Sequence, residues 1–211
     1  MKLFRTPASP FVRKVMVSII ELGLQDRVEL VSTRWPHAWA TETVAFAPDF
    51  AAATPVGRIP ALVTDDGLRL TDSQVICEYL DAEYGGHRLL PKEGPARWRA
   101  MEAVAIANAC LEAQILRRAE TLRQPPERSD AFIAKMQARG LRCFAALDAM
   151  TDRFGAEADL MQITAGAACG FVDWRYGHDD WRRVAPRLGA WYEGFRRRPS
   201  MVETEPAETP Q

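Results

Sequence analysis

The stretch TPVGRIPALVTDDGLRLTDSQVICEYL, residues 54–80, contains the signals that decide the fold. Two short runs in it, 60–65 and 68–71, are rich in apolar residues and bounded by turn residues, which predicts strands. The sequence DDG between them is typical of a hairpin turn, so the two strands should be antiparallel neighbours. A helix is then predicted from about Ser73 to Tyr84. Its predicted inward face consists of Val75, Ile76, Tyr79 and Leu80.

The residues before this stretch predict two more strands with a helix between them. The runs MKLF at 1–4 and RVELVS at 27–32 have the composition of strands. Between them, apolar residues recur at helical spacing as far as Gly23, a typical helix end. The apolar stripe consists of Phe11, Val15, Ile19 and Leu22. Residues 34–56 are irregular and rich in Ala, Trp and Pro, so we expect a loop there with one short helix.

The character of the chain changes near residue 85. A run of turn residues at 85–94 is typical of a linker, and the pattern after it is purely helical. Long helices are predicted at about 95–123 and 129–154. The sequence therefore predicts an α/β domain at 1–84, joined by the linker to an all-α domain at 95–211.

Two further helices are predicted in the C-terminal half. Asp159 and Gln162 have the spacing of a capping box and should open a helix. Gly166 and Gly170 follow in that helix, four residues apart, and permit a neighbouring helix to approach closely. The last helix should carry an apolar face made of Val184, Leu188, Trp191 and Phe195.

The overall composition excludes several classes of function. The chain has 211 residues, of which 47% are hydrophobic and 26% charged, with a net charge of −1, so bulk electrostatics favour neither nucleic acid nor an anionic membrane as a partner. No apolar run reaches the roughly 20 residues that span a bilayer, and the start lacks the apolar stretch of a signal peptide. The four cysteines and three histidines are scattered. We therefore expect reduced, buried thiols in a cytoplasmic protein and no metal site.

Three stretches together resemble the cytosolic glutathione transferases, and the resemblance covers nearly the whole chain. They are SPFVRKV at 9–15, the stretch 54–80 quoted above, and DLMQITAGAACGFVDWR at 159–175. Each motif is weak alone, but their order and spacing are specific. The resemblance implies a thioredoxin-like N-terminal domain followed by a helical bundle. It also implies glutathione as cosubstrate, a small hydrophobic electrophile as second substrate and a homodimer as the assembly.

Ser9 is the candidate catalytic residue. Ser at the N-cap with Pro10 at the first helical position is a common helix start, so a purely structural role would explain the pair. In a thioredoxin-like domain, however, this position lies across from Pro60, where redox relatives hold a reactive cysteine. A hydroxyl and the first-turn N–H groups there could stabilise bound glutathione as thiolate. Thr6 is the alternative hydroxyl, and residues 1–20 contain no tyrosine.

The resemblance also implies a set of glutathione contacts. It implies that the Ile59–Pro60 peptide bond is cis, which would leave the backbone of Ile59 free to pair with the tripeptide. Asp72 and Ser73 stand where a strand gives way to a helix, a suitable site for the γ-glutamyl group. The sequence TDSQ is also compatible with a capping box built from Thr71 and Gln74. Candidates for the glycyl carboxylate are Arg58, His37 and Trp35.

An electrophile pocket is expected between the two domains. Its candidate wall residues are Phe11, Ile106, Cys110, Gln114, Trp174 and Tyr176. Cys110 has no activating partner nearby in the sequence and is not a candidate nucleophile. Two alternatives remain open. The protein could bind glutathione without turnover, or it could be an interaction protein resembling the stringent starvation proteins. The intact motifs GRIP and TDS weigh against loss of the ligand site.

Overall fold

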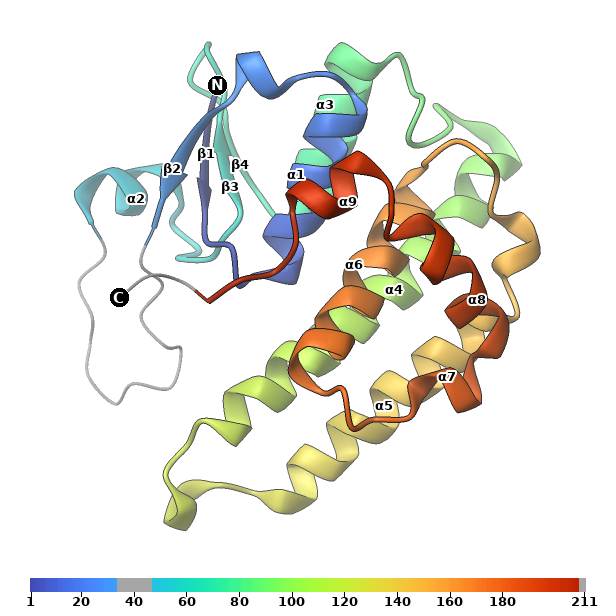
Figure 1. Ribbon diagram of the computed structural model, residues 1–211. Coiled ribbons are helices and arrows are strands. Elements are labelled where there is room, and N and C mark those ends of the chain that lie inside the picture. Colours follow the sequence, from blue (N-terminus) through green and yellow to red (C-terminus); the bar gives the residue numbers. More distant parts are fainter. Residues whose placement is uncertain (34–46, 209–211) are drawn as a thin grey trace.

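The computed structural model describes residues 1–33 and 47–208, and it combines a four-stranded sheet with a bundle of helices (Figure 1). The strand order is β2-β1-β3-β4. The strands are β1 (Lys2–Arg5), β2 (Glu29–Ser32), β3 (Ala61–Val63) and β4 (Arg69–Thr71). β2 is parallel to β1, whereas β3 is antiparallel to β1 and β4. The predicted hairpin of β3 and β4 is therefore confirmed.

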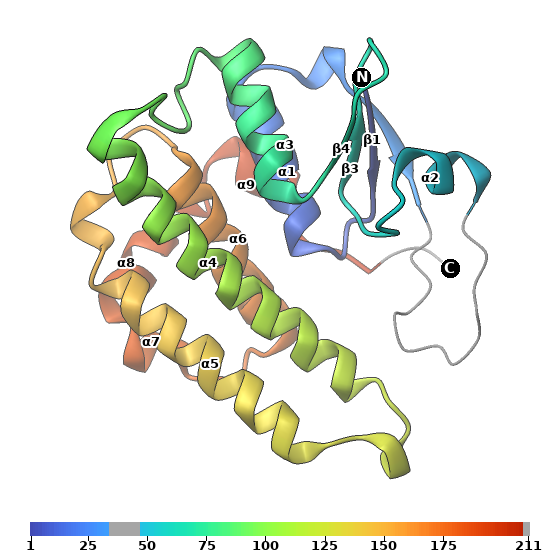
Figure 2. The same ribbon diagram turned by 180° about the vertical axis from the view of Figure 1, so that it is seen from behind.

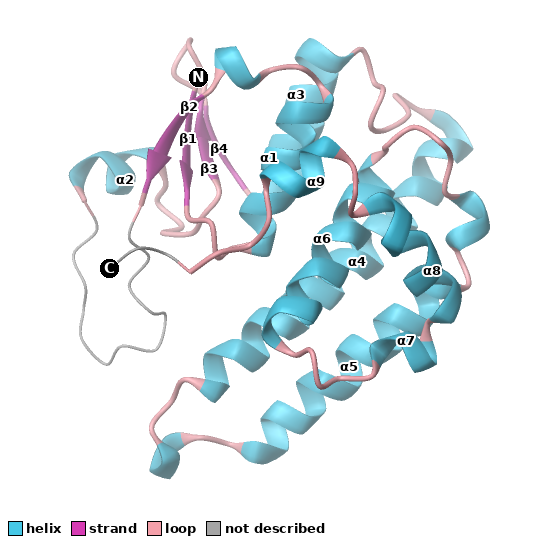
Figure 3. Ribbon diagram, in the orientation of Figure 1, coloured by secondary structure: helices cyan, strands magenta, loops and turns pink. Residues whose placement is uncertain are grey.

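The alternation of side chains along β1 and β3 separates the two faces of this sheet. Leu3 and Leu62 point into the main core, which α1 (Pro10–Glu21) and α3 (Ser73–Leu80) cover. Phe4 and Ala61 point to the opposite face and pack against α2 (Pro48–Ala53) through Phe50. Figure 3 shows this arrangement, with α2 and the pair α1 and α3 on opposite sides of the strands. The sheet is thus covered on both faces, as in a thioredoxin-like domain.

The C-terminal half contains helices and no strands among its described residues, 86–208. The helices are α4 (Gly94–Thr121), α5 (Asp130–Asp148), α6 (Leu160–Arg175), α7 (Trp181–Val184), α8 (Pro186–Phe195) and α9 (Pro199–Glu203). Short 3₁₀ turns lie at Gln25–Arg27, Pro125–Glu127 and Thr151–Arg153, and a π-helical turn at Asp81–Gly85 follows α3. Figures 1 and 2 show α4 and α5 side by side and antiparallel. No helix in the described part of the chain is long and apolar enough to cross a membrane.

The buried helix α6 holds the two halves together. Its predicted capping box is confirmed, because Asp159 accepts from Gln162 N while the Gln162 side chain accepts from Asp159 N. The absent side chain of Gly170 makes room for Arg13 of α1, whose Nη2 donates to Met201 O at 2.9 Å. Gly166 similarly accommodates the ring of Phe195. Small residues on α6 therefore permit close packing of helices from both halves.

The connection between the halves depends on one buried carboxylate. Asp81 is 1% exposed, and its oxygens accept from the backbone N–H groups of Leu89 and Leu90 at 3.0 and 2.9 Å. These bonds fix the turn that leads from α3 to α4. Residues 86–93 make up the segment between the π-helical turn and α4.

Three expectations about local structure are wrong. Val75 is 47% exposed, because α3 is covered by the core on one side only. Val184 belongs to the separate helix α7 and is 37% exposed, so it does not share a face with Leu188. The N-cap of α3 is Asp72, which accepts from Gln74 N at 2.7 Å, whereas Thr71 ends β4.

Candidate functional site

Three chain segments that carry predicted glutathione contacts meet at one edge of the sheet. Ala61 pairs with Phe4 of β1 and with Thr71 of β4, so the end of β1, the start of β3 and the end of β4 lie side by side. The segments next to the strands at this edge are 6–9, which follows β1, 59–60, which precedes β3, and 72–73, which follows β4. The N-termini of α1 and α3 follow at the same edge. Both present free N–H groups and the positive end of a helix dipole there.

Ser9 occupies the predicted N-cap of α1. Its Oγ accepts from Val12 N at 3.3 Å, and Pro10 is the first helical residue. The hydroxyl hydrogen remains available to a further acceptor, since capping uses only a lone pair. Ser9 is half-buried, whereas the alternative Thr6 is only 4% exposed and accepts from Ser9 N through its backbone oxygen. Ser9 is therefore the more accessible of the two hydroxyls.

Asp72 and Ser73 form the start of α3. Asp72 has a positive φ of 73°, an unusual conformation for a residue other than glycine, and its side chain is exposed. Ser73 is 4% exposed and is the first residue of the helix. The exposed carboxylate thus stands directly before a helix N-terminus, where an amine and a carboxylate of one ligand could both find partners.

The segment before β3 reaches the same edge. The Ile59–Pro60 peptide bond is cis. Ile59 is half-buried and Pro60 buried, whereas the predicted contact Arg58 is exposed. The predicted contacts His37 and Trp35 lie outside the described residues.

Two cationic residues that the sequence reasoning missed lie close to this edge. Arg5 ends β1, and its Nε is buried with no hydrogen-bond partner among the described residues. Lys14 of α1 is 0% exposed and donates to Asn108 Oδ1 at 2.9 Å. A signal for Lys14 was present, because it stands three residues after Phe11 and so lies on the apolar face of the helix.

Lys14 begins a chain of hydrogen bonds that joins α1, α3 and α4. Asn108 Nδ2 donates to Gln74 Oε1 at 2.9 Å, and Gln74 Nε2 donates to Glu78 Oε1 at 3.0 Å. Glu78 is also paired with Arg97. Burial lowers the pKa of Lys14, and the nearby charges of Asp72 and Glu78 partly oppose this shift. These hydrogen bonds fix the first turn of α3. The Gln74 side chain takes part in them, and its backbone N–H donates to the capping carboxylate of Asp72.

The residues of the predicted electrophile wall lie at two different depths in the structure. Phe11, Ile106 and Trp174 are half-buried and border the main core. Cys110, Gln114 and Tyr176 are 0%, 4% and 5% exposed, so they are interior residues and do not line an open cleft. Gln114 donates to Ala168 O on α6 at 3.3 Å, and Tyr176 donates to Gln114 O at 3.3 Å. These contacts give the three residues a packing role.

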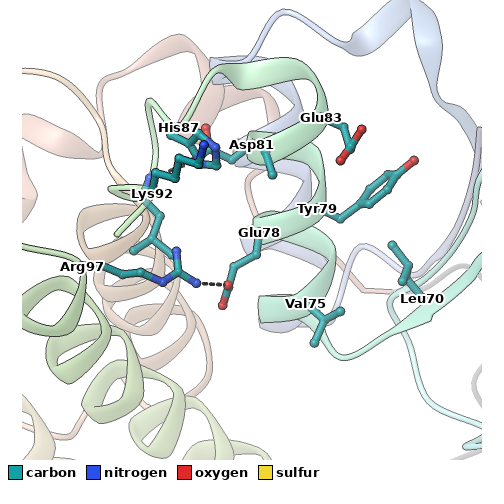
Figure 4. A pocket seen from close by; sticks show the side chains of 11 residues that line it. Leu70, Val75, Glu78, Tyr79, Asp81, Glu83, His87, Lys92 and Arg97 are labelled. Carbon is teal, nitrogen blue, oxygen red and sulfur yellow. Dashed lines mark hydrogen bonds and ion pairs between the residues drawn. The ribbon is translucent and has the colours of Figure 1, made fainter. Parts of the chain in front are cut away.

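A cavity of about 540 Å³ lies elsewhere, between α3 and the start of α4. Figure 4 shows Lys92 and Arg97 on one side of α3, with Tyr79 and Leu70 on the other. None of the predicted glutathione contacts among the described residues lines this cavity. Within residues 1–33 and 47–208, no group of three or more His, Cys, Asp or Glu side chains has the arrangement of a metal site.

Comparison with known proteins identifies relatives over the whole chain. The family model for the glutathione S-transferase N-terminal domain matches residues 8–83. A glutathione transferase family member from Pseudomonas fluorescens Pf-5, solved with bound glutathione, is 35% identical with a TM-score of 0.87, and the match covers 98% of this chain and 99% of that one. A glutathione S-transferase from Methylobacillus flagellatus KT, solved with glutathione bound, is 27% identical with a TM-score of 0.85 over 98% and 99%.

A curated relative covers the same length. The uncharacterized GST-like protein YibF of Escherichia coli (strain K12) is 25% identical over 98% of both chains. The matched family model spans α1 to α3 with the strands β2, β3 and β4, and the solved relatives extend the similarity through the helical half. The chain therefore belongs to the glutathione transferase family.

Proposed function

We propose that the protein is a glutathione transferase that binds glutathione at the sheet edge formed by residues 6–9, 59–60 and 72–73. The observation that carries the proposal is the convergence of these segments with two helix N-termini, in the fold of relatives solved with glutathione bound. The enzyme would activate the thiol either for conjugation or for peroxide reduction. In the first reaction a C–S bond forms; a substitution releases the leaving group together with the thiol proton, and an addition to an α,β-unsaturated carbonyl compound transfers that proton to the substrate. In the second, two glutathione molecules reduce ROOH to ROH and water and are oxidised to glutathione disulfide.

Ser9 is the proposed thiol contact. A thiolate is the nucleophile in both reactions, and its formation is favoured by hydrogen-bond donors and by a helix N-terminus. The Ser9 hydroxyl stands at the start of α1 with its hydrogen free to donate. Because serine cannot form a mixed disulfide, the proposal excludes thiol-transferase chemistry at this residue.

Ser73 and Asp72 are the proposed γ-glutamyl contacts. The first N–H groups of α3 and the Ser73 hydroxyl suit the α-carboxylate, while the exposed Asp72 suits the ammonium group. Gln74, whose backbone N–H donates to the capping carboxylate of Asp72, is itself held by the hydrogen bonds from Lys14 through Asn108. This support would keep the subsite in place without ligand.

The remaining proposed contacts concern the cysteinyl and glycyl units of glutathione and the second substrate. The backbone of Ile59 is proposed to pair with the cysteinyl unit in the manner of an added strand. The exposed Arg58, together with His37, is proposed for the glycyl carboxylate. Phe11, Ile106 and Trp174 are the proposed contacts of a hydrophobic electrophile.

A homodimer in the cytoplasm is proposed as the working form. Leu68, Val75 and Trp98 are 47%, 47% and 70% exposed, and an interface between protomers would cover apolar side chains of this kind. Light scattering behind gel filtration would give the mass of a dimer, and the mass of a monomer would refute this part. The free cysteines suit a reducing compartment.

The transferase proposal is tested by turnover. Purified protein is incubated with glutathione and a panel of aryl halides, α,β-unsaturated carbonyl compounds and organic hydroperoxides, and thioether or glutathione disulfide is measured. Glutathione-dependent turnover of at least one compound is expected. Binding of glutathione without any turnover would favour a binding protein instead, and absence of both would favour an interaction protein.

A further inference from the structure

Helices α4 and α5 bring two cysteines together that are far apart in the sequence. The two helices run antiparallel and in contact (Figure 2). The Cys110 thiol on α4 lies 3.8 Å from Gly140 O on α5, one helical turn before Cys143. Cys143 stands three residues after Gly140 and so shares with it the face of α5 that packs against Cys110, and the two thiols interact electrostatically. The packing of α4 against α5 therefore brings the two thiols into one neighbourhood, which is the first requirement for a disulfide between them.

The two thiols differ in access and in charge environment. Cys110 is 0% exposed, whereas Cys143 is half-buried. Interaction with the Cys110 thiol, assisted by the positive charges of Arg139 and Arg142, lowers the pKa of Cys143 to about 7. Burial raises the pKa of Cys110. The accessible thiol is thus also the one whose pKa is lowered.

The other two cysteines lack this combination. Cys77 and Cys169 are both 0% exposed, and burial raises the pKa of each thiol. An oxidant in solution cannot reach either without opening of the core. Selectivity for Cys143 then follows from accessibility and thiolate character together.

We propose that Cys143 and Cys110 form a hydroperoxide-sensitive dithiol, in which Cys143 is oxidised first and Cys110 closes a disulfide between α4 and α5. The Cys143 thiolate attacks the distal oxygen of ROOH, the O–O bond breaks, and ROH leaves with one proton taken up. The sulfenic acid on Cys143 is then attacked by the Cys110 sulfur. An S–S bond forms and the sulfenic oxygen leaves as water with the Cys110 proton. Two molecules of a small thiol such as glutathione return the pair to the reduced form and leave as their disulfide.

This dithiol is independent of the proposed glutathione site. None of its residues belongs to the segments 6–9, 59–60 or 72–73, and the oxidation step uses no bound glutathione. Failure of the transferase proposal would therefore leave this one untouched, and the reverse also holds.

The test is oxidation of the full-length protein followed by peptide mapping. Reduced protein is treated with one equivalent of hydrogen peroxide, remaining thiols are alkylated, and the tryptic digest is examined without reduction. A linked pair of the peptides 100–117 and 143–153 is expected, and it should disappear on treatment with glutathione. Cys77 and Cys169 should be found in the alkylated form, because the peroxide leaves them as thiols.

Variants separate the two roles. Cys143→Ser should lose the linked peptide and leave Cys110 reduced. Cys110→Ala should still be oxidised at Cys143, where dimedone traps the sulfenic acid, but no disulfide should form. Cys77→Ala is the matched control and should give as much linked peptide as the unmodified chain. Circular dichroism checks that each variant is folded.

Two outcomes would overturn the proposal. One is a sulfenic or sulfinic acid at Cys143 in the unmodified protein with no linked peptide, which would show that Cys110 cannot reach it. The other is oxidation of Cys77 or Cys169 at the same rate as Cys143. If Cys110→Ala proves unfolded, the unmodified protein and Cys143→Ser alone still decide between these outcomes.

Discussion

Substitution of Ser9 by alanine should separate the structural role of this residue from its chemical role. The structural cost is that of a lost N-cap. The hydrogen bond from Val12 N to Ser9 Oγ is long, at 3.3 Å, so the lower part of the usual range applies, about 0.5–1 kcal/mol of unfolding free energy. In a chain of this length that corresponds to a decrease in Tm of about 1–4 °C.

The chemical cost is larger. A hydrogen bond to a charged group is worth about 1.5–3 kcal/mol. Loss of the Ser9 hydroxyl should therefore raise the pKa of the bound glutathione thiol by about 1–2 units, because 1.36 kcal/mol corresponds to one unit. At a pH below the pKa of the bound thiol, the thiolate fraction, and with it turnover, should fall about 10- to 100-fold. The affinity for protonated glutathione should change little.

Ser129→Ala is the matched control for this experiment. Ser129 caps α5 and its Oγ accepts from Phe132 N at 3.2 Å, so it has the same local role in another part of the molecule. Both variants should lose similar stability, measured by thermal unfolding. Only Ser9→Ala should lose thiolate, measured by the ultraviolet absorbance of the glutathione complex as a function of pH. An unchanged thiol pKa in Ser9→Ala would refute the reasoning and direct attention to Thr6.

Three further predictions concern the framework of the site. Gly170→Ala should lower the free energy of unfolding in urea by about 1–3 kcal/mol, since its Cβ would lie 2.0 Å from Arg13 Nη1. Gly194→Ala, with nothing within 4 Å of its Cβ, should be neutral or stabilising, and equal losses would contradict this account of α6. Asp81→Ala should cost at least about 2 kcal/mol in the same assay, because two buried N–H groups lose their acceptor, and a smaller loss would mean that the linker turn is held by other contacts. Burial raises the pKa of Glu21, but hydrogen bonds from an arginine and a serine more than offset this and lower it overall. The stability that Glu21 contributes is thus present above about pH 4.5 and is lost as the pH falls through the lowered pKa. In this acidic range, the Tm of Glu21→Gln should fall less steeply with decreasing pH than that of the unmodified protein. Parallel curves would argue against this role of Glu21.

Most of the framework was predictable because its signals are local. The hairpin depends on the DDG turn, the start of α6 on the spacing of Asp159 and Gln162, and the start of α1 on Ser9 and Pro10. Each signal acts within a few residues along the chain. The register that brings Ser9, Pro60 and Asp72 to one edge is not local, and it was anticipated only through the resemblance to a known family.

The features that were missed depend on contacts between distant segments. Periodicity placed Val75 in the core, but it could not show that α3 is covered on one side only. Cys110 was judged without a partner because Cys143 lies on another helix and meets it only through the packing of α4 against α5. Lys14 was not singled out in the sequence, although its position on an apolar helix face was a usable signal.

The central claim is that this chain holds a glutathione site, and isothermal titration tests it most directly. The purified protein is titrated with glutathione and, in parallel, with S-hexylglutathione, which carries a hydrophobic group on the sulfur. The account predicts saturable binding of both at one site per chain. An absence of heat with either ligand, from protein that is folded by circular dichroism, would contradict it.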